Sequence, residues 1–243
     1  MKNELRGRKV LLTGASRGIG PYIARVLARQ GAALALTART ADALENAAAE
    51  IRELGVHAVA LPADVADSAA RKKLFADAEA AIGPLDILVN NSGLEWVSRY
   101  TALPVEDVEK MVHTNLVAPL ALSRLALPGM IERGHGHIVM MSSLGGKKGS
   151  PYSATYAATK AGLIAWTSGI REELRGTGVS ASVVCPGFVS DAGMFAVYGK
   201  SAPKLAGETT PEKVADEVLR AIRQDVGEIT VNPGPMRLMA VLE

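Results

Sequence analysis

Three residues in the second half of the chain have types and spacing suited to acid–base chemistry on a carbonyl group. Tyr156 and Lys160 lie four residues apart in a segment predicted to be helical, so their side chains share one helix face. A free phenol ionises near pH ~10 and a neighbouring ammonium favours the phenolate, so we expect Lys160 to lower the pKa of Tyr156. Ser143 follows an apolar run, and its hydroxyl could hold a carbonyl oxygen that faces the phenol. Tyr and Lys also occur at this spacing on exposed helices, so the interpretation depends on the rest of the chain.

The elements that must position these residues alternate regularly. The predicted strands are 9–14, 32–38, 57–63, 85–91, 137–143, 179–186 and 228–233, and the predicted helices are 18–30, 40–54, 67–82, 104–133, 151–175 and 211–225. Because the strands are continuously apolar, we expect helices on both faces of a sheet. The alternation predicts a single α/β domain over residues 1–243, built on a doubly wound, seven-stranded parallel sheet flanked by helices.

Two stretches depart from this regularity. Pro119 and Pro128 lie inside the long helical segment and predict a bend near residue 118 and a stop near residue 128. The segment 188–210 has no clear strand and follows the carboxyl end of a predicted strand, where a substrate lid would lie. The alternative is an ordinary surface excursion.

A glycine-rich turn joins the first predicted strand to the first predicted helix. Residues 13–20 read TGASRGIG. Glycines permit a tight turn and let the backbone approach a pyrophosphate, while the helix N-terminus offers free N–H groups to its charge. In this strand–turn–helix context the segment predicts a dinucleotide site.

The charges around this turn predict which dinucleotide binds. An NAD site places Asp or Glu at the end of the second strand, to accept a hydrogen bond from the ribose 2′-hydroxyl. Here the second strand ends with Thr37, Ala38 and Arg39, and Arg17 lies in the glycine turn. Two guanidinium groups suit a 2′-phosphate, so NADP is predicted. Either arginine alone could be an ordinary solvated surface residue.

Composition excludes several other classes of protein. The 243 residues carry a net charge of +2 with Lys and Arg spread along the chain, which argues against nucleic acid as the main partner. The single cysteine, Cys185, lies among apolar residues, which favours a buried thiol and a reducing compartment. We expect no integral membrane segment, because no apolar run approaches ~20 residues, and no signal peptide. The histidines lack the neighbours of a zinc site, so no metal is expected. A cytoplasmic location is predicted.

Taken together, these features resemble the short-chain dehydrogenase/reductase family over essentially the whole chain. The glycine turn matches the cofactor motif of that family, Ser143, Tyr156 and Lys160 match its triad, and Asn115 falls at its catalytic asparagine. Further similar segments are Ala63-Asp64-Val65, Asn90-Asn91-Ser92-Gly93 (with Ser92 where the family usually has Ala) and Pro186-Gly187, followed by Val189.

The resemblance implies a Rossmann-like fold and an NADP(H)-dependent enzyme that interconverts carbonyl and alcohol groups. Tyr156 would be the general acid/base, Ser143 would hold the substrate oxygen, Lys160 would also hold the nicotinamide ribose, and Asn115 would fix a water that leads to solvent. The implied cofactor-binding residues are Gly14, Ser16, Arg17, Gly18, Ile19, Gly20, Arg39, Asp64, Val65, Asn91, Ser92, Gly93, Tyr156, Lys160, Pro186, Gly187 and Val189. Asp191 departs from the usual Thr, so its carboxylate either turns away from the cofactor or weakens binding.

The substrate is predicted only as a class. Aromatic and apolar residues near the expected site favour a mainly hydrophobic carbonyl or alcohol, although some could instead pack against another subunit; they are Trp96, Tyr152, Met194 and Phe195. A 3-oxoacyl-thioester reductase and a broad-specificity carbonyl reductase are both compatible with this pocket.

Other classes of function stay open. A non-catalytic NADP-sensing protein could use the same fold, but relatives of that class tend to have lost the Tyr or Lys, and both are present here. The apolar ending 235–242 suggests weakly a peripheral membrane enzyme. Relatives of this family are usually dimers or tetramers built through the long helices 104–133 and 151–175, so a homo-oligomer is expected.

Overall fold

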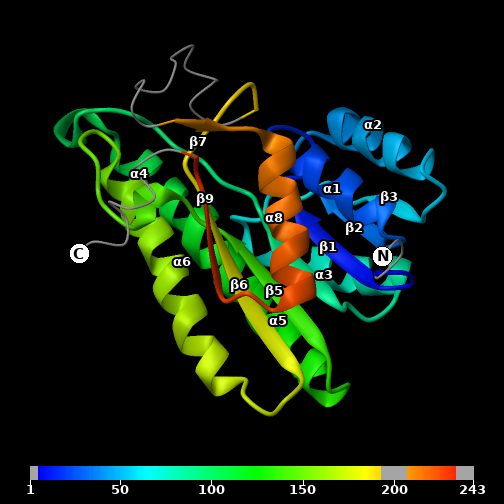
Figure 1. The fold of residues 1–243 in the computed structure, drawn as a ribbon. Coiled ribbons are helices and arrows are strands. Elements are labelled where there is room, and N and C mark those ends of the chain that lie inside the picture. The colour runs from blue at the N-terminus through cyan, green and yellow to red at the C-terminus, as the bar shows by residue number, and fades with distance from the viewer. Residues whose placement is uncertain (1–4, 193–206, 234–243) are drawn as a thin grey trace.

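The structure is a computed structural model that describes residues 5–192 and 207–233. Seven parallel strands form one sheet in the order β3-β2-β1-β4-β5-β6-β9, with helices on both faces (Figure 1). The strands of this sheet are β1 (Lys9–Thr13), β2 (Ala33–Thr37), β3 (Ala58–Ala60), β4 (Ile87–Asn90), β5 (Gly136–Met141), β6 (Val179–Pro186) and β9 (Glu228–Val231). The helices are α1 (Gly20–Arg29), α2 (Ala41–Arg52), α3 (Ser68–Ile82), α4 (Val105–Val112), α5 (Ala118–Glu132), α6 (Ala154–Glu173) and α8 (Pro211–Gln224), with short turns η1 (Tyr100–Ala102), η2 (His113–Val117) and η3 (Leu144–Gly146). This confirms the predicted doubly wound sheet.

The strand order contains one reversal that decides where a ligand can bind. The chain runs outward from β1 through β2 to β3 and then returns to β4, which pairs with the other side of β1. Above the carboxyl ends of β1 and β4 the connections therefore diverge in opposite directions. Open parallel sheets bind ligands in the crevice at such a reversal.

Two layers of apolar side chains cover the sheet and explain its continuously apolar strands. On one face, Val10 and Leu12 of β1 pack with residues of α1, α2 and α8. On the other face, Leu11 packs with residues of α3, α5 and α6. These three β1 side chains are fully buried, so both faces of this central strand are covered.

Local sequence signals explain several helix boundaries. Asp67 precedes α3 and its carboxylate accepts a hydrogen bond from the backbone N–H of Ala70 at 2.6 Å. Thr210 does the same for α8 through the N–H of Lys213, and Pro211 opens that helix, where the missing N–H costs nothing.

The two prolines of the long helical segment have different effects. A single π-helical turn, His113–Val117, lies immediately before Pro119, as expected for a distortion at this point. The predicted stop near residue 128 is wrong, because α5 continues through Pro128 to Glu132. Pro128 is exposed, so the carbonyl of Arg124, which loses its helical donor there, lies on the solvent side.

The combined helix Val105–Glu132 is long and apolar enough to cross a membrane by length and composition alone. Half of its most apolar window is buried inside the fold, which is the pattern of a core helix. Packing inside the fold therefore accounts for part of its apolar character.

The segment that follows β6 contains two short strands that the sequence pattern does not reveal. β7 (Phe188–Val189) pairs in parallel with β8 (Glu208–Thr209), so the expectation that 188–210 has no strand is wrong at its two ends. Strands of two residues are too short to produce an alternating or apolar pattern. Most of the predicted lid, residues 193–206, lies outside the described residues, as does the apolar ending 235–242.

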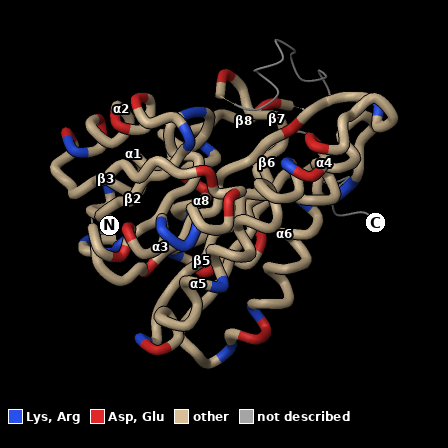
Figure 2. The backbone as a smooth tube through the Cα atoms, turned by 180° about the vertical axis from the view of Figure 1, so that it is seen from behind, with Lys and Arg blue, Asp and Glu red and all other residues tan. Residues whose placement is uncertain are grey.

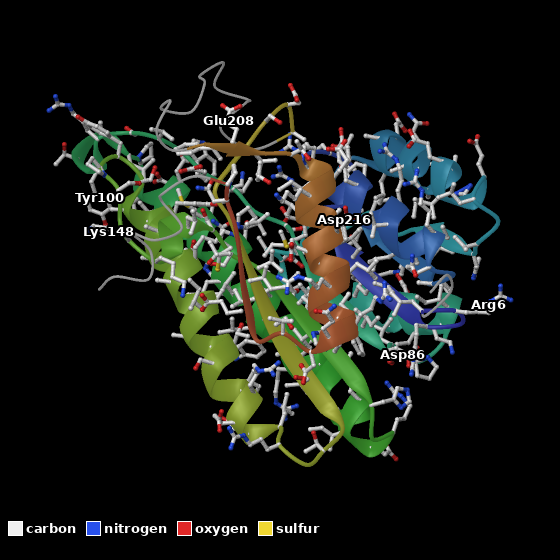
Figure 3. The ribbon with its side chains drawn as sticks, in the orientation of Figure 1. Arg6, Asp86, Tyr100, Lys148, Glu208 and Asp216 are labelled. Carbon is white, nitrogen blue, oxygen red and sulfur yellow. The ribbon has the colours of Figure 1, made fainter. Side chains whose placement is uncertain are left out.

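Charged residues are interspersed by sign over the face seen in Figure 2. Tyr100, Lys148 and Glu208 project near the end of the sheet where the strands finish, whereas Asp86 lies at the opposite end, where they begin (Figure 3). The residues expected to do chemistry belong to the first of these two ends.

Candidate active site

The glycine turn after β1 leaves room for a ligand next to the backbone. Gly14 and Gly18 have φ values of +68° and +63°, a region that favours glycine. A Cβ on Gly20 would overlap the carbonyl oxygen of Gly14, so the turn closes tightly on the start of α1. Ile19, which precedes α1, makes no side-chain cap. Pro21 has no N–H, and the N–H groups of Tyr22 and Ile23 donate to the carbonyl of Ile19, each at 3.1 Å, so what the start of α1 offers a phosphate is the positive end of the helix dipole.

Thr13 and Asn91 join the ends of β1 and β4. The Thr13 hydroxyl oxygen accepts hydrogen bonds from the backbone N–H groups of Asn91 and Ser92, each at 3.0 Å. In return the Asn91 amide donates to the carbonyl oxygens of Thr13 and Gly14, each at 3.1 Å. These four hydrogen bonds hold the glycine turn and the loop after β4 in one fixed arrangement.

A cavity of about 1100 Å³ lies over the carboxyl ends of the strands, at the reversal in strand order. Of the predicted cofactor-binding residues, all except Gly20 line this cavity; Gly20 is buried beneath the turn. Arg17, Arg39 and Asp64 are exposed at its edge. Asp191 lines it with a left-handed backbone and is exposed to solvent.

Ser143, Tyr156 and Lys160 meet at the other end of the same cavity. Gly145 marks the point of convergence, since a Cβ there would lie 3.5 Å from the Ser143 Oγ and 3.6 Å from the Tyr156 Cε1. The Ser143 hydroxyl donates to the carbonyl oxygen of Pro186 at 3.5 Å and accepts from the N–H of Gly145 at 3.1 Å. Lys160 Nζ lies 5.6 Å from the centre of the Tyr156 ring and donates to the carbonyl oxygen of Met141 at 2.7 Å. Strand β5 and helix α6 thus bring the three predicted side chains together.

Asn115 lies in the π-helical turn, completely buried and outside the cavity lining. Its amide oxygen accepts from the backbone N–H of Leu94 and its amide nitrogen donates to the carbonyl of Leu94, both at 2.7 Å. The same nitrogen donates to the Thr159 hydroxyl at 3.3 Å. Pro119, four residues on, has no N–H to offer the main-chain carbonyl of Asn115. The side chain therefore fixes the loop after β4, and the main-chain carbonyl is the group that could hold a water.

Burial sets the pKa values of the catalytic pair. The pKa of Tyr156 is raised above its ordinary value, first by burial and then by the charge of Glu95, and the nearby Ser143 hydroxyl offsets only part of this. The prediction that this pKa is lowered is therefore wrong for this structure. Burial lowers the pKa of Lys160 to about 8, against the opposing charges of Cys185 and Glu95. A phenol with a raised pKa keeps its proton at neutral pH but is a weaker acid than a free phenol.

Glu95 is a residue at this site that the sequence analysis missed. It is half-buried and lines the cavity together with Tyr156. The Ser153 hydroxyl donates to its Oε1 at 2.9 Å. Burial raises the pKa of its carboxyl, while the hydrogen bond from Ser153 and the charge of Lys160 act against this. The sequence signal was slight: an acidic residue between Leu94 and Trp96, in the loop that follows β4.

The predicted substrate residues fall in three places. Tyr152 is exposed and lines the main cavity, with a left-handed backbone at φ 69°. Trp96 lies instead on a separate small cavity of about 30 Å³ that Tyr152 and Tyr156 also line. Met194 and Phe195 lie outside the described residues.

A reactive thiol and a metal centre are two other kinds of site that the residue types could form. Cys185 is fully buried, and burial raises the pKa of its thiol to about 12, so it is no nucleophile. Within residues 5–192 and 207–233, no three His, Cys, Asp or Glu side chains are grouped so that they could hold a metal ion.

Comparison with known proteins agrees with this geometry. The family model for short chain dehydrogenases matches residues 8–202, so the chain belongs to the short-chain dehydrogenase family of oxidoreductases. It is 44% identical over 232 residues to ketoacyl reductase HetN of Nostoc sp. strain PCC 7120, covering 96% of this chain and 81% of that one. It is 34% identical to an uncharacterized oxidoreductase of Staphylococcus aureus strain N315, covering 94% and 98%.

A solved structure is also similar. The crystal structure of a metagenomic short-chain oxidoreductase in complex with NADP superposes with a TM-score of 0.81 at 35% identity, covering 94% of this chain and 98% of that chain. At this TM-score and coverage the two proteins share the same fold.

Proposed function

We propose that the chain is an NADP(H)-dependent oxidoreductase that interconverts a carbonyl and an alcohol, with Tyr156 as general acid/base. The observation that carries this proposal is the convergence of Ser143, Tyr156 and Lys160 in the cavity that also contains the glycine turn. The name of the ketoacyl reductase relative supports a keto group as the reacting centre.

The residues at the glycine turn fit an NADP molecule. A side chain at Gly20 would collide with the Gly14 carbonyl, and the positive φ values of Gly14 and Gly18 keep the backbone open towards the cavity. The start of α1 would hold the pyrophosphate, and Arg17 and Arg39 would hold the 2′-phosphate. When bound, this cofactor supplies or accepts the hydride.

In the reduction direction, the remaining chemistry belongs to this chain. Ser143 donates a hydrogen bond to the substrate oxygen and stabilises the negative charge that develops on it. Tyr156 gives that oxygen its proton. Lys160, held by the carbonyl of Met141, places a positive charge beside the resulting phenolate. A water at the main-chain carbonyl of Asn115 would return a proton from solvent.

We further propose one domain over residues 1–243, a homodimer or homotetramer assembled through α5 and α6, and a cytoplasmic location. The continuous seven-stranded sheet supports the single domain, and the exposed residues of these helices support the assembly. A lid over 188–210 is supported by Ala192, whose carbonyl oxygen lies 3.1 Å from the position of a Cβ on Gly18. The start of the segment thus lies against the glycine turn.

The test is NADPH oxidation by the purified chain with a panel of ketones, diketones and ketoacyl thioesters. We expect turnover with hydrophobic ketones and weaker activity with NADH. Tight NADPH binding without turnover of any panel member would contradict the enzyme and favour an NADP-sensing protein.

A further inference from the structure

The carboxyl group of Glu95 has a fixed place on the cavity wall near Tyr156. Its neighbour Leu94 is held at both main-chain groups by Asn115. Three residues after Glu95, the N–H of Ser98 donates to the carbonyl of Tyr152 at 3.0 Å. The Ser153 hydroxyl binds the carboxyl itself. Glu95 is therefore attached on both sides to elements that carry the catalytic residues, and its carboxyl stays at the cavity.

Glu95 belongs to the substrate end of the cavity. Its partner Ser153 immediately precedes α6, three residues before Tyr156. Glu95, Tyr156 and Lys160 line the same cavity, and the charge of Glu95 acts on the pKa values of the other two. The arginines suited to phosphate lie instead beyond β1 and β2, next to the glycine turn.

A carboxylate at this position weakens the binding of a substrate whose groups beside it are purely hydrocarbon. Besides the bond from Ser153, an ionised carboxylate can accept further hydrogen bonds, and an apolar substrate group in contact with it supplies none. Sites with buried polar groups reject analogues that leave those groups unpaired, more strongly than apolar pockets reject a change of shape. A donor group on the substrate would remove this penalty.

We propose that Glu95 is a specificity-determining residue that accepts a hydrogen bond from a hydroxyl or amide N–H group carried by the carbonyl substrate. The inference rests on the proposed function and narrows its substrate class. It also refines the expectation of a mainly hydrophobic substrate, because one polar group must accompany the reacting carbonyl.

Two pairs of ketones test this, each matched in size except for the donor. Hydroxyacetone and butanone differ by a hydroxyl against a methyl, and N-methylacetoacetamide and N,N-dimethylacetoacetamide differ by an amide N–H. The kcat/KM ratio within each pair is measured with NADPH for the wild-type chain, Glu95→Leu and Glu95→Gln. Glu173→Leu, an exposed position on α6, is the matched control. Comparing ratios between variants cancels intrinsic ketone reactivity and any change in the pKa of Tyr156.

We expect the donor-to-no-donor ratio of at least one pair to fall roughly tenfold to a hundredfold in Glu95→Leu, by a smaller factor in Glu95→Gln, and not at all in Glu173→Leu. The pair that responds identifies the hydroxyl or the amide as the donor. Ratios that agree within twofold between the wild type and Glu95→Leu for both pairs would overturn the inference while leaving the proposed function intact.

A binding measurement separates the two failures. Dissociation constants of the two amides for the NADP⁺-loaded chain, measured by ligand-observed NMR, do not depend on turnover. We expect the N–H amide to bind more tightly to the wild type and to lose this advantage in Glu95→Leu. If no ketone is turned over, the proposed function fails, and equal binding of both amides by the wild type would then overturn the role of Glu95 as well.

Discussion

Lys160 reaches past the Tyr156 ring, with its Nζ 5.6 Å from the ring centre, and donates to the carbonyl oxygen of Met141. Its side chain is almost completely buried, and burial lowers its pKa to about 8 from an ordinary value of 10.5. Burying an ammonium group costs free energy, so Lys160 lowers the free energy of unfolding of the protein.

Lys160→Met should therefore stabilise the fold while it removes activity. Below pH 8 the lysine is protonated in both states and the folded state bears the full desolvation cost, so the variant should gain roughly 1–3 kcal/mol of unfolding free energy at pH 7. The gain should shrink as the pH rises from 8 towards 10.5, where the amine is neutral in both states. Urea unfolding at several pH values measures this. A variant less stable than the wild type at pH 7 would contradict the desolvation account.

Tyr156→Phe removes the proposed proton donor and little else. We expect kcat to fall by about 10²–10⁴-fold, because general acid catalysis contributes that much. The Kd for NADPH, followed by fluorescence, should change little. Turnover close to that of the wild type would remove Tyr156 from the mechanism.

Arg39→Ala should alter the choice of cofactor. Loss of a charge-assisted hydrogen bond to the 2′-phosphate should raise KM for NADPH roughly tenfold to a hundredfold and leave KM for NADH nearly unchanged. Arg29→Ala, exposed at the far end of α1, is the control. Equal effects on both cofactors would show that Arg39 does not read the phosphate.

Gly20→Ala should damage the glycine turn. The added methyl would overlap the Gly14 carbonyl oxygen, so about 1–3 kcal/mol of unfolding free energy should be lost. Gly169→Ala lies in α6 with no atom within 4 Å of the added Cβ and should gain about 0.5–1 kcal/mol. Equilibrium urea unfolding of both variants compares a crowded glycine with an open one.

Asp86 at the amino ends of the strands should control acid stability. Burial raises its pKa, but the N–H of Lys9 at 2.8 Å, His135 at 2.7 Å and Arg8 at 3.2 Å together hold the pKa below its ordinary value of 3.8. A lowered folded-state pKa adds stability that is complete above the unfolded pKa and is lost as the pH falls through the folded one. Asp86→Asn should cost about 1–3 kcal/mol at pH 7. The cost should disappear on acidification below pH 3.8, as thermal unfolding would show.

Much of this fold was predictable because its signals are local. All seven strands of the main sheet were predicted, since each is a continuous apolar run between amphipathic helices. β7 and β8 were not, because two residues form no pattern. The end of the helix was wrongly predicted at Pro128. Whether a helix tolerates a proline depends on which side of it faces solvent, and tertiary packing decides that.

The candidate site divides in the same way. Residues identified by type and spacing, such as Tyr156 and Lys160, do converge in the structure. Their pKa values could not be predicted, because the depth of burial depends on the packed fold, and burial outweighs the attraction expected between the two side chains. Glu95 was missed for a related reason, since a glutamate in a loop gains meaning only when Ser153 is found beside it.

The reversal between β1 and β4 separates two tasks in space. Arg17 and Arg39 follow the carboxyl ends of β1 and β2. The residues proposed for proton transfer follow β5 or lie in α6, on the other side of β4. Substitutions in the cofactor-binding half of the cavity should therefore have little effect on the half that holds the substrate. Exchanging a few residues in the loop after β2 should change the preference of the protein between NADP and NAD. The reaction with the carbonyl substrate should continue as before.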